Sequence, residues 1–266
     1  MNISKNNKKF ALFLDSGQGG LSILDYYLKS NEFANVIYFG DTAHFPYGKK
    51  HRDELFQYIK SIYDNLKKEF DIAIVVLACN TASVSVLDLL REYIKIPIIG
   101  TVPPIKVAAE ITKNNKIGVI ATETTVELDY LSNLIDEFAK DKEVYMKASN
   151  PLVKIVEENS PDNEKDRIIE QELKTLKEEG IDTLVLGCTH YSLIKERIEK
   201  YFDNKINVID PRDGVSKRIK SISDDSINST IPERILFLSD ESSLDKYKKI
   251  NDKLKIFNKI MVRYID

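Results

Sequence analysis

Strand-like apolar runs alternate with helical patterns along nearly the whole chain. Eight short apolar runs predict strands: Phe10–Leu14, Val36–Phe39, Ile72–Ala78, Pro97–Gly100, Ile117–Ala121, Thr183–Gly187, Asn207–Ile209 and Arg234–Leu238. Between them lie amphipathic stretches such as Arg52–Phe70, whose apolar residues recur at helical spacing. Several of the strands are apolar at every position, as expected when helices cover both faces of a sheet. The pattern predicts an α/β protein with mainly parallel sheets.

The order of the motifs predicts two α/β units of like design. In the first half, one strand leads to DSGQGG and a later one to ACNTAS; in the second half, one leads to TETTV and a later one to CTHYSL. The prolines of GTVPP predict the break between the units. We therefore expect a first domain of residues 1–101 with 211–266 and a second domain of residues 102–210. Ligands bind outside the carboxyl ends of parallel strands, so the polar strand ends would line one cleft if the units face each other.

Composition and charge exclude several classes of protein. Hydrophobic residues make up 42% and charged residues 30% of the chain, which is ordinary for a globular protein. The net charge of −3 gives no basic footprint for nucleic acid or for an anionic membrane. No apolar h-region follows the polar start MNISKNNKKF, so it does not resemble a signal peptide, and the longest apolar run, Ile72–Cys79, is far too short for a membrane span. We expect a soluble, cytoplasmic protein.

The chain has only two cysteines, and each follows an apolar strand. Cys79 lies in IVVLACNT and Cys188 in TLVLGCTHY, both followed by small polar residues. A free cysteine is often only a small buried apolar residue, but the N–H groups of a helix N-terminus favour a thiolate at such a corner. With no CxxC and only three histidines, neither a disulfide framework nor a zinc site is indicated. The matched placement favours a functional pair.

Three chemistries suit two such thiols. A redox disulfide requires the two sulfur atoms to be close enough to bridge. A single nucleophile assisted by His190 would suit acyl transfer. Acid–base chemistry on both faces of one carbon is what racemisation without an electron sink requires, because one base removes a proton and a conjugate acid returns one from the opposite face. DSGQGG and the loop GDTAHFPYG add backbone N–H groups for a small anion, and we read His44 and His51 as surface residues.

The motifs DSGQGG, GDTAHFPYG, ACNTAS, GTVPP, ATETT, VKIVEE and GCTHYSL stand in an order and spacing that resemble the cofactor-independent glutamate racemases of the aspartate/glutamate racemase superfamily. The resemblance covers about residues 10–220. It implies two similar α/β domains in pseudo-twofold arrangement, with the active site in the cleft between them. It also implies interconversion of L- and D-glutamate for peptidoglycan synthesis, with no metal or organic cofactor.

The resemblance implies roles for individual residues. Cys188 would deprotonate L-glutamate and Cys79 D-glutamate. Asp15 and His190 are similar to groups that assist Cys79 and Cys188, and Glu157 to a glutamate that contacts the amino-group region or assists His190. The substrate-holding positions of the family are matched by Asp15, Ser16, the Tyr47 and Gly48 backbone, Asn80, Thr81, Thr122, Thr125, Thr189 and His190.

The sequence leaves two other functions open. Aspartate racemase uses the same two-thiol logic on a shorter substrate, and a noncatalytic amino-acid-binding paralogue is a second alternative, disfavoured by the presence of both thiols. A pyridoxal enzyme would need a lysine in the site, and the strand-end motifs offer none. Relatives dimerise in more than one way, so a homodimer is an open alternative.

The chain departs from residues common in the family at Gln18, His44 (usually arginine), Lys154 and Ser192 (usually proline), and Pro211.

Overall fold

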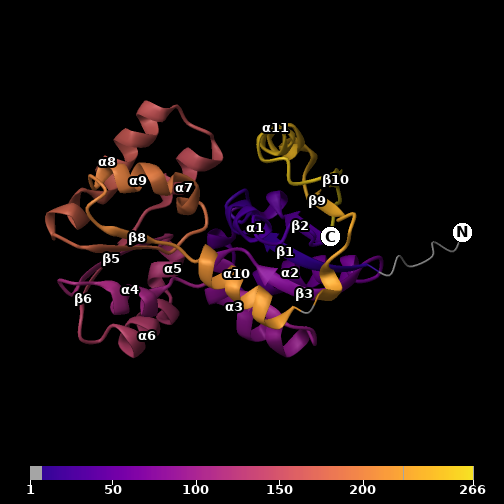
Figure 1. Ribbon diagram of the computed structural model, residues 1–266, viewed down its shortest axis with the longest axis horizontal. Coiled ribbons are helices and arrows are strands. Elements are labelled where there is room, and N and C mark those ends of the chain that lie inside the picture. Colours follow the sequence, from indigo (N-terminus) through magenta and orange to yellow (C-terminus); the bar gives the residue numbers. More distant parts are fainter. Residues whose placement is uncertain (1–7, 224, 266) are drawn as a thin grey trace, which may run out of the picture. The chain divides into compact units, whose positions relative to one another are not determined.

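The computed structural model describes residues 8–223 and 225–265. The chain divides into two compact units, one formed by the residues up to Thr101 and from Val215 onwards, the other by Val102–Gly214 (Figure 1). The sequence-based prediction places the return to the first unit earlier, at residue 211. The difference arises because helix α10 (Arg212–Ile222) runs through this point without a break, and its Val215 and Ile219 lie in the core of the first unit.

The strands of the described residues form two sheets in which every strand pair is parallel. The first sheet contains β1 (Lys9–Asp15), β2 (Val36–Gly40), β3 (Asp71–Leu77), β4 (Ile98–Gly100), β9 (Arg234–Leu238) and β10 (Lys259–Val262) in the order β10-β9-β2-β1-β3-β4. The second contains β5 (Lys116–Ala121), β6 (Glu143–Ala148), β7 (Thr183–Leu186) and β8 (Asn207–Ile209) in the order β6-β5-β7-β8. The predicted α/β class with parallel sheets is confirmed.

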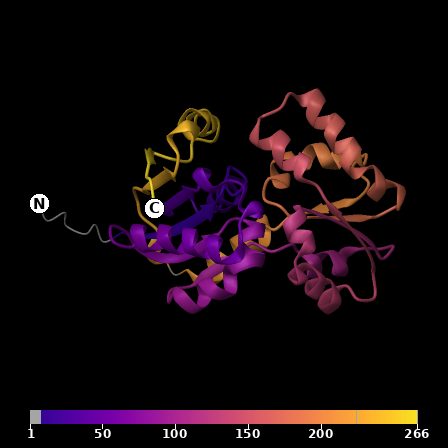
Figure 2. The same cartoon turned by 180° about the vertical axis from the view of Figure 1, so that it is seen from behind.

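Helices connect the strands in both units (Figures 1 and 2). The first unit contains α1 (Leu21–Leu28), α2 (Arg52–Leu66), α3 (Asn80–Tyr93), α11 (Leu244–Leu254) and most of α10, with 3₁₀ helices η1 (Thr42–His44), η2 (Tyr47–Lys49), η4 (Asp225–Ile227) and η5 (Glu241–Ser243). The second contains α4 (Ile105–Ile111), α5 (Glu123–Glu127), α6 (Asp129–Phe138), α7 (Asn150–Glu157), α8 (Asp162–Glu178), α9 (Lys195–Tyr201) and 3₁₀ helix η3 (Tyr191–Ile194). Within the described part of the chain, no helix has both the length and the apolar character needed to cross a membrane.

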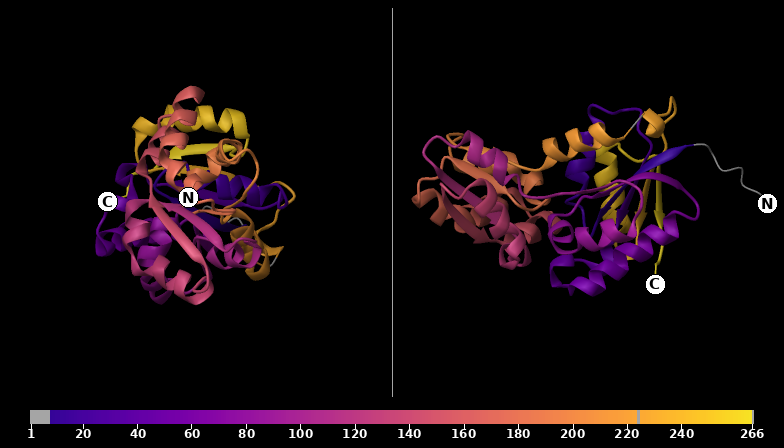
Figure 3. Two further views of the ribbon diagram at one scale, coloured as in Figure 1. Left: turned by 90° about the vertical axis from the view of Figure 1, so that its left-hand side faces the viewer. Right: turned by 90° about the horizontal axis from the view of Figure 1, so that it is seen from below.

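The inner residues of β1, Phe10–Leu14, are all apolar because both faces of the strand are covered. Side chains alternate between the two faces of a strand. Leu12 and Leu14 pack with α2 and α3, whereas Ala11 and Phe13 pack with α1 and α10 on the opposite face. Helices therefore cover both faces of the first sheet (Figure 3). Since each buried leucine or phenylalanine contributes roughly 1.5–3 kcal/mol, a strand between two helical layers stabilises both cores at once.

The two sheets share one strand order, which agrees with the two units of like design predicted from the motifs. In the first unit, β2 and β3 flank β1, and β4 lies beyond β3; in the second, β6 and β7 flank β5, and β8 lies beyond β7. The strands that precede Asp15 and Cys79 are thus neighbours, and so are the strands that precede Thr122 and Cys188. Each sheet brings one polar strand end next to one cysteine.

All eight strands predicted from the sequence are present, and β6 and β10 were missed. Both are edge strands with half-exposed or exposed residues, as in the sequence EVYMKA of β6. An edge strand is buried on fewer sides, so its sequence lacks the continuous apolar run that marks the central strands.

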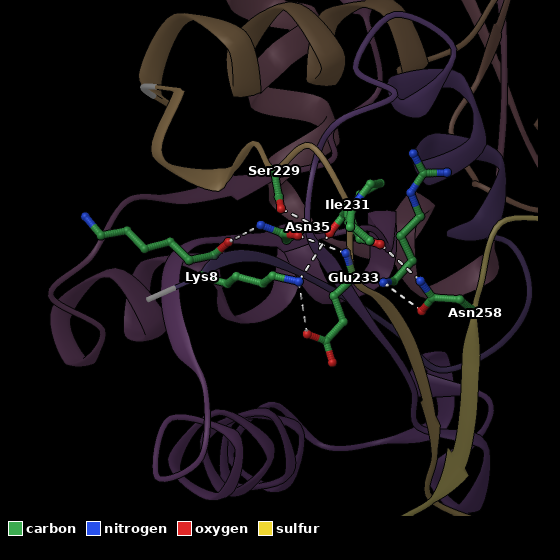
Figure 4. Close-up of polar contacts among 9 residues, drawn as sticks. Lys8, Asn35, Ser229, Ile231, Glu233 and Asn258 are labelled. Atoms are coloured by element: carbon green, nitrogen blue, oxygen red, sulfur yellow. Dashed lines mark hydrogen bonds and ion pairs between the residues drawn. The ribbon is translucent and has the colours of Figure 1, made fainter. Parts of the chain in front are cut away.

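The segment after Ile222 is tied to the beginning of the first unit by a cluster of polar contacts around Asn35 (Figure 4). The Asn35 Oδ1 atom accepts the Glu233 N–H at 2.9 Å, and the Asn35 backbone N–H donates to the Ile227 carbonyl at 2.7 Å. Lys8 Nζ donates to the Ile231 carbonyl at 3.2 Å and lies 3.8 Å from Glu233. These contacts align β9 beside β2 and complete the first sheet.

Asp182 ties the residue before β7 to the segment that follows α4. Its carboxylate accepts the Thr112 hydroxyl at 2.6 Å and the N–H groups of Lys113 and Asn114 at 2.6 and 2.8 Å. Partial burial raises the pKa of Asp182, but these bonds and one from Thr183 outweigh it, and the pKa lies below its ordinary value. The ionised carboxylate is the form that the fold stabilises.

We expect Asp182→Asn to lower the free energy of unfolding by about 1–2 kcal/mol near neutral pH, because the bonds to a charged acceptor are lost. A carboxyl group with a lowered folded pKa contributes stability above its unfolded pKa, and this contribution is lost as the pH falls through the folded pKa. The difference between wild type and variant should therefore shrink below about pH 4. Urea unfolding at several pH values measures it, with Asp141→Asn, at an exposed carboxylate bonded to the adjacent Lys142, as the control. If the difference in unfolding free energy between wild type and Asp182→Asn grew as the pH fell, the lowered pKa of Asp182 would be contradicted.

Candidate active site

The predicted site residues gather in two groups, each at the carboxyl edge of its own sheet. The first unit holds the predicted residues Asp15, Ser16, Tyr47, Gly48, Cys79, Asn80 and Thr81. The second unit holds the predicted residues Thr122, Thr125, Glu157, Cys188, Thr189 and His190. Cys79 is the N-cap residue of α3, and Thr122 is that of α5. Both cysteines are free thiols and are buried, at 7% and 6% exposure.

Glycines allow close approach at these strand ends. A Cβ atom on Gly20 would lie 2.8 Å from the Ala78 carbonyl oxygen, and one on Gly187 would lie 2.9 Å from the Ile120 carbonyl oxygen. Backbone atoms cannot move aside as a flexible side chain can, so larger residues would push the strand ends apart. The glycine preceding Cys188 and the last glycine of DSGQGG are therefore needed for packing beside the two thiols.

Asp15 is fully buried and organises the turn after β1. Its Oδ1 accepts the Ser16 N–H at 2.7 Å, and its Oδ2 accepts the Gly20 N–H at 2.5 Å at the start of α1. These bonds hold the carboxylate at the strand end beside the one that leads to Cys79. The two N–H groups supply the hydrogen-bond donors that a buried carboxyl group needs.

Asn80 follows Cys79 at the first turn of α3 and is 2% exposed. Neither its Oδ1 nor its Nδ2 atom has a hydrogen-bond partner among the described residues. Buried amides are nearly always paired, because an unpaired buried polar group costs free energy. An amide of this kind at a strand end suits a polar ligand with both donors and acceptors.

The loop after β2 brings Tyr47 to the first thiol. Tyr47 is 2% exposed, belongs to the same core cluster as Cys79, and donates its hydroxyl to Asp41 Oδ2 at 2.9 Å. Burial raises the pKa of Tyr47 well above its ordinary value, and the negative charge of Asp41 adds to this effect. Sequence reasoning assigned no role to Asp41, although its place directly after a strand end was the available signal.

The interpretation of His44 as a surface residue is wrong. His44 is half-buried, and its Nδ1 lies 2.8 Å from Asp41 Oδ1. His51, read in the same way, is exposed. The two histidines lie close in sequence, and only the fold separates their environments.

Cys188, His190 and Glu157 form a connected chain in the second unit. The Cys188 Sγ lies 3.7 Å from His190 Nδ1, and His190 Nε2 lies 2.6 Å from Glu157 Oε1. Burial lowers the pKa of His190, but its hydrogen bonds with Cys188 and Glu157 outweigh this and raise the pKa to about 10. The imidazole is therefore a cation near neutral pH.

Tyr191 supports this arrangement. It is fully buried, and its hydroxyl donates to the Ser149 carbonyl at 2.6 Å, just before α7. Because Glu157 is the last residue of α7, this bond ties that helix to the turn that carries Cys188 and His190. Sequence reasoning did not single out Tyr191, since an aromatic residue after the histidine gives no sign of its distant partner.

Small hydroxyl groups surround the second strand ends. The hydroxyls of Thr122 and Thr125 lie 2.9 Å apart, and the Thr125 N–H donates to the Thr122 hydroxyl at 3.4 Å. Thr125 and Thr189 are 0% and 1% exposed. These groups follow β5 and β7, which are neighbours in the sheet. They suit a small ligand with carboxylate and ammonium groups.

The family model described as Asp/Glu/Hydantoin racemase matches residues 32–214. The chain belongs to this family. It is 37% identical over 222 residues to a glutamate racemase of Actinobacillus pleuropneumoniae serotype 3, covering 83% of this chain and 84% of the relative. A glutamate racemase of Sulfurihydrogenibium sp. is 37% identical over 239 residues, covering 89% of this chain and 91% of the relative. The predicted resemblance and the enzyme class, an amino-acid racemase, are confirmed.

Solved structures of the family share the fold. The Escherichia coli glutamate racemase, described in complex with L-glutamate and the activator UDP-MurNAc-ala, superposes with a TM-score of 0.88 at 28% identity, over 97% of this chain and 99% of that one. The aspartate racemase of Picrophilus torridus superposes with a TM-score of 0.55 at 17% identity, over 81% of this chain and 94% of that one. The second likeness shows the fold alone.

Proposed function

We propose that this racemase interconverts L- and D-glutamate by proton transfer between two thiols. The observation that carries the proposal is a buried cysteine after a central parallel strand in each unit, each with polar partners at the same sheet edge. The reaction requires both thiols at one α-carbon, on opposite faces. A matched pair of cysteines at strand ends would meet this requirement.

The proposed reaction balances without another reactant. With L-glutamate, the Cys188 thiolate takes the α-proton, and the electron pair of the C–H bond stays on the carbon as a carbanion-like species. The Cys79 thiol then donates its proton to the opposite face, which gives D-glutamate and leaves a thiolate at Cys79. The reverse direction uses the same steps with the roles exchanged.

The partners of the two thiols support this assignment. The His190 imidazolium offsets the negative charge of a Cys188 thiolate, and Glu157 holds the imidazolium in place. In the first unit, Asp15 and Tyr47 stand near Cys79 and carry no positive charge. The two thiols therefore sit in different electrostatic surroundings, although they perform matching steps.

The substrate would be held by small polar groups. The amide of Asn80 supplies a donor and an acceptor that no described residue occupies. Ser16, Thr81, Thr122, Thr125 and Thr189, with the Tyr47 and Gly48 backbone, supply hydroxyl and N–H groups. Such a set suits two carboxylates and an ammonium group better than an apolar side chain.

The similarity to named relatives favours glutamate over aspartate as the substrate. Relatives at 36–39% identity over most of the chain bear the name glutamate racemase, whereas the aspartate racemase shares the fold alone. The noncatalytic alternative is disfavoured because both thiols and the imidazolium–carboxylate pair are retained. As part of the same proposal, D-glutamate would supply peptidoglycan synthesis in the cytoplasm, where two catalytic thiols stay reduced.

We expect the protein, freed of metal and pyridoxal phosphate, to invert both glutamate enantiomers in deuterated water and to incorporate solvent deuterium at the α-carbon. Optical rotation follows inversion, and proton NMR follows exchange in the same sample. L- and D-aspartate are the matched substrates. Inversion of aspartate alone would replace glutamate as the substrate, and a folded protein that neither inverts nor exchanges any of the four would contradict the proposal.

A further inference from the structure

Asp41 connects His44 with Tyr47 in the first unit. The carboxylate is 1% exposed and follows β2 directly. Its Oδ1 and Oδ2 atoms lie 2.8 and 3.0 Å from His44 Nδ1, and its Oδ2 also accepts the Tyr47 hydroxyl at 2.9 Å. A buried carboxylate needs such donors, because an unpaired charge in the interior is costly. His44 therefore shares in fixing the acceptor of Tyr47.

Tyr47 links Asp41 to Cys79, the thiol of the first unit. It lies with Cys79 in one core cluster, and a negative charge on Cys79 or Asp15 would raise the pKa of the Tyr47 hydroxyl. The same loop supplies the Tyr47 and Gly48 backbone that the proposed function assigns to the substrate. A shift of Asp41 would thus reach both Cys79 and the substrate through Tyr47.

The outer side of His44 is held by stacking. Its ring lies 3.6 Å from the ring of Tyr58 on α2, with an angle of 17° between the planes. The Tyr58 hydroxyl donates to Glu54, and Lys50 Nζ lies 3.8 Å from Glu54 Oε1. Because stacking fixes the plane of the imidazole, Nδ1 remains directed at Asp41. The loop is thereby attached to α2 on one side and to the core on the other.

We propose that His44 is a positioning residue for the Cys79 step, acting through Asp41 and Tyr47. The inference rests on the proposed two-thiol function and adds to it a residue outside the reacting groups. The observations that carry it are the contact of His44 Nδ1 with the Asp41 carboxylate and the stacking of the imidazole on Tyr58.

The variant His44→Phe keeps an aromatic ring for Tyr58 and removes the donor to Asp41. We expect kcat to fall about tenfold with a smaller change in KM, since one hydrogen bond to a charged group is lost. His44→Asn retains an amide nitrogen close to the place of Nδ1, and should recover most of the activity. His51→Phe, at the exposed histidine before α2, is the matched control.

Isotope effects separate positioning from general damage. L- and D-glutamate have equal free energies, so kcat/KM must fall equally in both directions, whichever thiol is affected. The primary deuterium effect on kcat/KM does not obey this constraint. Slowing the Cys79 step makes proton removal from D-glutamate more rate-limiting and removal from L-glutamate less so. The isotope effect should therefore rise for D-glutamate and fall for L-glutamate in His44→Phe.

Each outcome decides the question. Opposite changes in the two isotope effects, with recovery in His44→Asn, support the proposal. Unchanged isotope effects would overturn it, whether kcat is unchanged or lower, because a loss of folded enzyme alone leaves both isotope effects as they were. Failure of the proposed function itself would look different, since wild type would then neither invert nor exchange glutamate.

Discussion

Replacing either cysteine with serine is expected to lower racemisation by about 10³-fold or more, because a serine hydroxyl is far too weak an acid to exchange protons as a thiol does. The loss should be similar in Cys79→Ser and Cys188→Ser, since each turnover needs both groups. Polarimetry with each enantiomer measures inversion, and circular dichroism checks that the variants are folded. Both thiols are buried, and serine is nearly isosteric, so the fold should survive.

The two variants should differ in the exchange that remains. Cys79→Ser retains Cys188 and should exchange the α-hydrogen of L-glutamate only, with retention of configuration. Cys188→Ser should exchange that of D-glutamate only. Mild and equal losses of racemisation in both variants would contradict the two-thiol assignment, and exchange of both enantiomers in one variant would contradict the assignment of faces.

Glu157→Gln should have the second largest effect, a loss of roughly tenfold to a hundredfold in kcat. The carboxylate lies 2.6 Å from His190 Nε2, and a hydrogen bond between charged groups contributes about 1.5–3 kcal/mol. A neutral amide no longer stabilises the imidazolium, so the pKa of His190 should fall from about 10. Without that cation, the Cys188 thiolate loses its nearest positive charge. NMR titration of the His190 ring measures the change.

Glu158→Gln is a matched control for this variant. Glu158 is the next residue along the chain, but its side chain is 59% exposed and lies 3.9 Å from Lys154. Its replacement should leave kcat and the His190 titration unchanged. The isotope effect should rise for L-glutamate in Glu157→Gln, opposite to the direction expected for His44→Phe. A His190 pKa that stays near 10 in Glu157→Gln would show that Glu157 does not hold the charge.

The same pair makes stability depend on pH. The folded pKa of His190, about 10, lies above the ordinary value of 6.5. A group whose pKa is raised on folding contributes its full stability below the unfolded pKa, and that contribution is lost as the pH rises through the folded pKa. The stability advantage of wild type over Glu157→Gln should therefore shrink between about pH 6.5 and pH 10. Urea unfolding across this range measures it.

The fold was largely predictable because its central strands are buried on both faces. Ile72–Ala78 is apolar throughout and was predicted as a strand, as was Thr183–Gly187, and the structure has both. β6 and β10 escaped because an edge strand can carry polar residues such as Glu143 and Lys147 without burying them. The sequence also did not predict where along α10 the chain returns to the first unit, since a proline before a helix does not show which core the helix will join.

By itself, the sequence determined that both cysteines end strands and precede polar turns, because strand, glycine and turn signals are local. Tertiary structure alone decided which distant groups meet them. His190 and Glu157 are joined only when α7 packs beside the turn after β7. Asp41, His44 and Tyr58 meet only when the loop after β2 lies on α2, and nothing near His44 distinguishes it from the exposed His51. Strand order and helix packing arise from burial summed over the whole chain, so no local pattern records these contacts.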